Sequence, residues 1–197
     1  MADEPAYIRN FKAFAKSDVT FNDLPALESE MYGTNDRATA IMMSAVTETC
    51  LEIFLREKTR PTLSSEDTAK IFDFRGPLGD FSSKTMLAYA FNMFGPDTKH
   101  DLELIRMLRN EWAHSRRSFG FHTKEVSDVC KHLRAVDWPG AKLPDGYLRA
   151  MPEDQRSAAM ARSNPKTRYV TTCHTIAERL LWNAGEIPPG AATPDLR

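Results

Sequence analysis

Residues 101–122 read DLELIRMLRNEWAHSRRSFGFH, and this stretch decides the fold predicted for the whole chain. Its apolar residues recur at steps of three or four, the spacing that returns to one side of an α-helix. The apolar stripe consists of Leu104, Ile105, Leu108 and Trp112. A second side of the same helix carries the polar residues Glu103, Arg106, Asn110 and His114. The stretch therefore predicts an amphipathic helix with its apolar side against a core.

Arg109 lies at the margin of the apolar stripe, between the two sides. Because an unpaired guanidinium is costly to bury, we expect it to pair with a carboxylate. The carboxylates that we consider as its partner are Asp36, Asp80 and Glu103. One short helix thus offers a guanidinium, the Asn110 carboxamide and the His114 imidazole.

The composition indicates one soluble globular domain. The chain has 197 residues, of which 42% are hydrophobic and 27% charged, with a net charge of -1. This charge argues against non-specific binding of nucleic acid or membranes. No apolar run approaches the ~20 residues of a membrane span, and the first residues are too polar for a secretory signal. Three cysteines without a CxxC spacing fit a reducing compartment, so we expect a cytoplasmic protein.

Helices are also predicted for nearly all of the remaining chain, with no convincing pair of β-strands. The expected fold class is all-α, a single-domain bundle of about six to eight helices. We divide the chain into an amphipathic N-terminal arm (1–20), a helical core (21–136), a connection with the C-terminal helix (137–185) and a flexible tail (186–197). The predicted helices cover residues 5–16, 22–31, 35–58 (capped by Thr34), 64–74, 81–94, the central helix from Pro96 (with Asp97 able to cap it), 123–135, about 153–162 and 164–183.

Two stretches together resemble the mannitol operon repressor family of bacterial regulators. The first is the turn and helix start Gly76-Pro77-Leu78-Gly79-Asp80-Phe81-Ser82-Ser83-Lys84, and the second is residues 104–114. The resemblance covers about residues 35–135. It implies a helical transcriptional regulator that acts mainly through contacts with a regulatory or transport protein. It assigns a structural role to the turn formed by Gly76, Pro77, Leu78, Gly79 and Asp80.

The second stretch also resembles the Arg-Asn-x3-His motif of HEPN-domain proteins, matched here by Arg109, Asn110 and His114. This resemblance implies the alternative function, a metal-independent ribonuclease that acts as a dimer, such as a toxin or defence effector. An imidazole can move a proton to or from a ribose oxygen, and a guanidinium can stabilise the charge of the phosphate in the transition state. The candidate binding residues around the motif are Glu103, Arg106, Arg116, Arg117 and Lys124.

The sequence leaves open whether the chain is an enzyme, and we favour the regulator. No cofactor loop is present, and the pairs of neighbouring Cys and His residues are too sparse for a metal site. Direct sequence-specific DNA binding is not expected, because no helix-turn-helix reader is evident. We expect a homodimer for either function, and RNA as a partner only for the ribonuclease.

Overall fold

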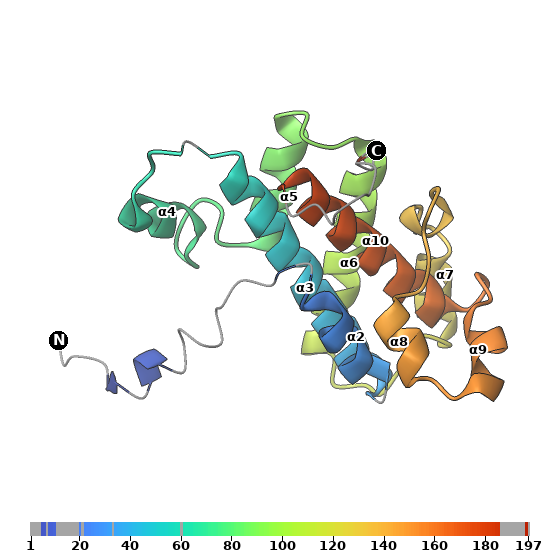
Figure 1. The fold of residues 1–197 in the computed structure, drawn as a ribbon. Helices are drawn as coiled ribbons and strands as arrows, with labels where there is room; N and C mark the ends of the chain where they lie inside the picture. Colours follow the sequence, from blue (N-terminus) through green and yellow to red (C-terminus); the bar gives the residue numbers. More distant parts are fainter. Residues whose placement is uncertain are drawn as a thin grey trace.

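The computed structural model describes residues 5–6, 8–10, 20, 22–32, 34–59, 61–185 and 196. All regular secondary structure in these residues is helical, so the all-α bundle predicted from the sequence is confirmed (Figure 1). The elements are α2 (Leu24–Tyr32), α3 (Asp36–Glu57), α4 (Ser65–Phe72), α5 (Phe81–Ala90), α6 (Pro96–His114), α7 (Lys124–Cys130), the 3-10 turn η1 (Ala135–Asp137), α8 (Asp145–Ala150), α9 (Glu153–Ala159) and α10 (Pro165–Asn183).

Helices α3 and α10 pack against each other at the centre of the bundle (Figure 1). Fourteen of the nineteen residues of α10 are buried, which means that other elements cover most of its circumference. The Tyr169 hydroxyl of α10 donates a hydrogen bond of 2.9 Å to the Ala40 carbonyl of α3. The cap of α3 is Asn35, whose side chain accepts from the Ala38 N–H, and not Thr34 as predicted. The Thr34 hydroxyl instead donates to the Met31 carbonyl.

The central helix α6 buries the predicted stripe against α3 and α5. Ile105, Leu108 and Trp112 are buried, and Leu104 is half-buried. The helix begins at Pro96 as expected, because proline is preorganised for the first turn. Asp97 makes no cap, however; its carboxylate forms an ion pair with Arg134.

Asp101 joins α6 to the segment that follows α7. Its buried carboxylate accepts hydrogen bonds from the backbone N–H groups of Arg134 and Ala135, at 2.7 to 3.0 Å. Burial raises the pKa of this carboxyl from its usual 3.8 to about 6, because removal from water disfavours the charged form. The backbone hydrogen bonds lower the pKa and only partly offset this effect.

The turn between α4 and α5 depends on glycine. A Cβ atom on Gly76 would lie 2.4 Å from the backbone carbonyl oxygen of Ile71, and one on Gly79 would lie 2.4 Å from that of Asp73. Asp80 caps α5 by accepting from the Ser83 N–H at 3.0 Å, and its hydrogen bonds to Ser83 lower the pKa of this carboxyl. A side chain at either glycine would therefore meet the backbone of this turn.

Several predicted boundaries are wrong. Helix α5 ends at Ala90 rather than at residue 94, and Asn92 just beyond it takes a left-handed conformation with φ of 55°. The helix predicted over 123–135 is split into α7 and η1, and the region after it holds two short helices, α8 and α9. Most of the predicted N-terminal arm and tail lie outside the described residues.

Helix α3 is, by length and composition, the one described helix apolar enough to cross a membrane. Its sequence is not an unbroken apolar run, because Glu48 and Glu52 interrupt it. In the structure α3 is a core helix with half of its most apolar window buried, and its Glu48 and Glu52 form ion pairs with neighbouring helices.

Candidate functional site

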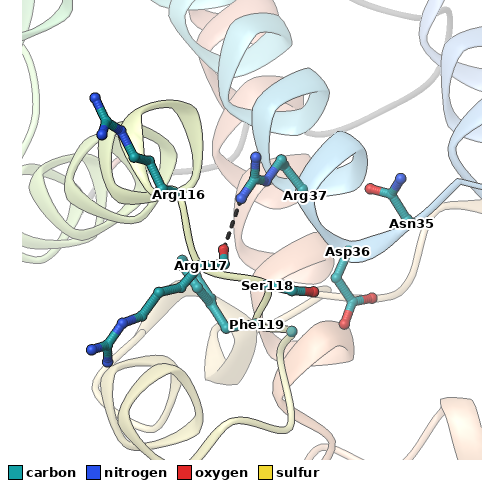
Figure 2. A pocket seen from close by; sticks show the side chains of 8 residues that line it. Asn35, Asp36, Arg37, Arg116, Arg117, Ser118 and Phe119 are labelled. Atoms are coloured by element: carbon teal, nitrogen blue, oxygen red, sulfur yellow. Dashed lines mark hydrogen bonds between the residues drawn. The ribbon is translucent and has the colours of Figure 1, made fainter.

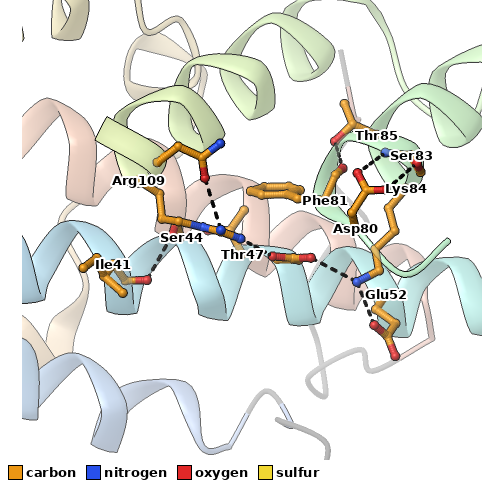
Figure 3. Close-up of polar contacts among 12 residues, drawn as sticks. Ile41, Ser44, Thr47, Glu52, Asp80, Phe81, Ser83, Lys84, Thr85 and Arg109 are labelled. Carbon is orange, nitrogen blue, oxygen red and sulfur yellow. Dashed lines mark hydrogen bonds and ion pairs between the residues drawn. The ribbon is translucent and has the colours of Figure 1, made fainter. Parts of the chain in front are cut away.

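Arg109 of α6 points at α3 and pairs with Glu48. Its Nη2 atom lies 2.9 Å from Glu48 Oε2, and its Nη1 donates to Asn110 Oδ1 at 3.2 Å (Figure 3). The carboxylate partner predicted from the sequence exists, but the three candidates were wrong. Glu48 lies sixty-one residues from Arg109 in the chain, in the middle of α3.

The Arg109 pair belongs to a larger cluster of charges between α3, α5 and α6. Lys84 of α5 is almost fully buried, and its Nζ lies 3.1 Å from Glu48 Oε1 and 2.8 Å from Glu52 Oε2 (Figure 3). Glu52 also pairs with Arg56 one turn later on α3. Three cations therefore share two carboxylates, and this arrangement holds α5 and α6 against α3. Removal of either carboxylate leaves the buried Lys84 with one partner in place of two.

His114, the third residue of the predicted catalytic group, is exposed at the last position of α6. Five residues along an α-helix correspond to about 7.5 Å of rise and about 140° of rotation. The imidazole therefore leaves α6 on a different side from Arg109. Within one chain Arg109 contacts Asn110, whereas His114 lies one turn beyond Asn110 and forms no hydrogen bond with Arg109 among the residues that the structure describes.

Some of the other predicted binding residues form ion pairs, and others have exposed or unpartnered groups. Glu103 pairs with Lys99 on its own helix, and Lys124 pairs with Asp128 on α7 at 2.8 Å. Arg106 is half-buried, and its Nε atom has no hydrogen-bond partner in the described part of the chain. Arg116 and Arg117 are exposed, and they follow α6 in the loop 115–123, which we call the arginine loop.

A wide, open hollow of about 860 Å³ lies between the arginine loop and the N-terminal end of α3 (Figure 2). Arg116 and Arg117 line it from the loop, and Asp36 and Arg37 line it from α3. Asn35, Ser118, Phe119 and Gly120 complete the lining. The hollow brings together two residues that the sequence marked for binding with a third arginine, Arg37, that it did not.

Arg37 has no sequence signal that would have marked it. It is an exposed residue in the first turn of a helix, where a cation is not favoured by the helix dipole. Its role depends on the return of the chain after α6, seventy-eight residues later, to the start of α3. This placement is a property of the fold and not of any local pattern.

The comparisons with known proteins identify the fold. No family model matches the chain, and no curated protein matches it. Among solved structures, it matches a chain in the X-ray structure of the MtlR-HPr complex from Escherichia coli, with a TM-score of 0.53. The two are 21% identical, and the match covers 81% of this chain and 98% of that chain. The fold is MtlR-like.

The three cysteines are part of the core of this MtlR-like bundle. Cys50, Cys130 and Cys173 are free and buried. Burial raises the pKa of the Cys50 and Cys130 thiols to about 12, so both are protonated and unreactive at neutral pH. Within the described residues, no group of three His, Cys, Asp or Glu side chains is placed to hold a metal ion.

Proposed function

We propose that this chain is a regulatory protein that acts by binding another protein. The observation that carries this proposal is the Glu48–Arg109 ion pair of 2.9 Å. A ribonuclease would need the Arg109 guanidinium to hold a phosphate, and Glu48 occupies and neutralises it. Arg109 therefore acts in packing α6 on α3.

The fold supports a protein partner for this chain. The structural neighbour is a complex of MtlR with HPr. We infer that a regulatory or transport protein of this kind is also the partner here, and that transcription changes indirectly through this contact. The net charge of -1 supports the indirect route, because a protein that tracks the phosphates of DNA needs a basic face.

A homodimer is the assembly that we propose for the regulator. Exposed apolar side chains on α5 and α6 support it, since Met86 and Met107 are 49% and 37% exposed. Apolar side chains that remain in water on neighbouring helices gain free energy when a second copy covers them. The N-terminal arm predicted from the sequence lies mostly outside the described residues.

The experiment that tests the function combines one binding assay with one cleavage assay. The purified chain is titrated with HPr from the same organism by isothermal calorimetry, and a saturable complex is expected. In parallel, wild type and His114→Ala are incubated with structured and unstructured RNA in EDTA, and intact RNA is expected for both. Cleavage by wild type that is lost in both His114→Ala and Arg109→Ala would overturn the regulator in favour of the ribonuclease. A missing HPr complex would remove HPr as the partner.

A further inference from the structure

The arginine loop is held in one conformation by the start of α3. The Nη2 atom of Arg37 donates to two loop carbonyls, at 3.1 Å to Ser115 and at 3.0 Å to Arg117. Figure 2 shows the second of these hydrogen bonds. Further along the loop, the Phe121 N–H donates to Asp36 at 2.9 Å. Two adjacent residues of α3 thus fix the loop backbone at both ends.

An aromatic cluster in the core holds the same loop through its Phe119 and Phe121 side chains. The Trp112 ring of α6 stacks on Phe119 with a centroid distance of 5.3 Å, and it contacts Phe121 at 4.8 Å. Phe121 in turn packs on Tyr169 of α10. Because Trp112 and Phe121 are fully buried, the loop is anchored in the core. A loop that is ordered before binding loses little conformational entropy when a partner arrives.

The side chains of Arg116 and Arg117 extend from this fixed backbone without partners. Both are exposed, and neither guanidinium has a hydrogen bond or ion pair within the described ranges. Asp36 is the one carboxylate among the residues that line the hollow, and Lys166 lies 3.2 Å from it. The hollow therefore presents uncompensated positive charge on a rigid support.

We propose that the arginine loop is the docking surface for an acidic segment of a protein partner. Figure 2 shows that the guanidinium groups of Arg116 and Arg117 point apart, both away from the loop. Groups that diverge do not converge on one small anion, but they fit two separate carboxylates on an extended surface. Arginine pairs with carboxylates through two parallel hydrogen bonds, which sets orientation as well as affinity.

The surroundings of the loop favour a short acidic segment over a long polyanion such as RNA. A track for RNA would need further free cations along α7. Lys124 and Lys131 on that helix both pair with Asp128, at 2.8 and 2.7 Å. Glu125 is exposed beside them. These two lysines are therefore already paired with a carboxylate. The proposal rests on the protein-binding function proposed above.

The test measures binding of a fluorescein-labelled decapeptide of alternating Glu and Asp by fluorescence anisotropy at low salt. We compare the full chain with Arg116→Glu/Arg117→Glu and with the matched control Arg75→Glu/Arg149→Glu. The control arginines are exposed and lie outside the hollow, and both double variants change the net charge equally. We expect at least about tenfold weaker binding for the loop variant and at most about twofold for the control. Inorganic phosphate and a single-stranded RNA decamer serve as competitors, and neither is expected to displace the peptide at equal concentration.

Each other outcome overturns either the docking surface or the regulatory function on which it rests. No binding of the peptide to wild type, or equal weakening in both double variants, means that the loop has no selective affinity for carboxylates. Displacement by phosphate or RNA at equal concentration assigns the loop to phosphates. If wild type binds HPr but not the acidic peptide, the docking surface fails and the regulatory function stands. If RNA is cleaved, the regulatory function fails whatever the peptide does.

Discussion

Glu48 is the residue whose loss tests the proposed packing role of Arg109 most directly. It is the carboxylate that both Arg109 and Lys84 share, and its side chain is 19% exposed. The variant Glu48→Gln keeps the size and shape of the side chain and removes the charge. Lys84 would then keep Glu52 alone, and Arg109 would lose its ion pair.

The expected loss of stability follows from burial. Loss of one partner from a buried ion pair costs about 3–5 kcal/mol, because the other charge remains desolvated. Lys84 is 5% exposed, which places it in this class, whereas Arg109 is 33% exposed and contributes less. Since Lys84 retains Glu52, we expect a value of about 3 kcal/mol, near the low end. For a domain of this size that corresponds to a fall in Tm of about 6–12 °C.

A second variant separates charge balance from simple loss of contacts. Lys84→Met leaves two balanced pairs, Glu48 with Arg109 and Glu52 with Arg56. We therefore expect it to cost only about 1–2 kcal/mol. The double variant Glu48→Gln/Lys84→Met removes the stranded lysine, so its cost should fall below the sum of the two single costs by about 1–2 kcal/mol.

Urea denaturation followed by circular dichroism measures all three variants, with Glu66→Gln as the control. Glu66 is 80% exposed and pairs with the exposed Lys70, so its loss should cost less than about 0.5 kcal/mol. A cost below about 1 kcal/mol for Glu48→Gln, or strict additivity in the double variant, would refute the role of the charge cluster. Arg109 would then be available for other chemistry.

Three further changes have defined outcomes. Burial raises the pKa of Asp101 to about 6, so the folded state binds more protons than the unfolded state between about pH 4 and pH 6. This carboxyl therefore makes the protein less stable as the pH rises through that window. The free energy of unfolding of wild type relative to Asp101→Asn should thus fall by about 3 kcal/mol from pH 3.5 to pH 7, and a difference independent of pH would contradict the assignment. Gly76→Ala should cost at least about 2 kcal/mol in urea denaturation, since its Cβ would overlap backbone oxygens; a neutral effect would show that the turn can open. Arg37→Ala should weaken the acidic peptide about three- to tenfold and increase amide exchange at residues 115–119, and unchanged exchange would mean that Arg37 does not hold the loop.

The parts of the fold that the sequence predicted well are those set by local patterns. The stripe of Ile105, Leu108 and Trp112 is the buried side of α6, and Asn164 caps α10 with Pro165 in its first turn. Spacing and capping depend on neighbours within four residues, so they can be read directly from the chain.

The contacts that the sequence analysis missed join residues on different helices that are far apart in the chain. The pairing of Arg109 with Glu48 requires that the middle of α3 lies beside α6, and no local rule gives that distance. Arg116 and Arg117 were found from their charge, but the Arg37 contacts that fix their backbone were not. The sequence therefore named charged groups that could bind, whereas the fold decides which of them are free.

Helix α3 determines both which arginine is paired and which loop is held in place. The middle of α3 supplies Glu48, which neutralises Arg109, and its first turn supplies Asp36 and Arg37, which fix the loop that carries Arg116 and Arg117. The same packing of α3 on α6 thus neutralises the guanidinium of Arg109 and orders the loop that carries the two exposed guanidinium groups. A catalytic Arg109 would require α3 to release it, and this would also loosen the charge cluster that holds α5. A binding function needs no such movement, because the free cations already stand on an ordered support.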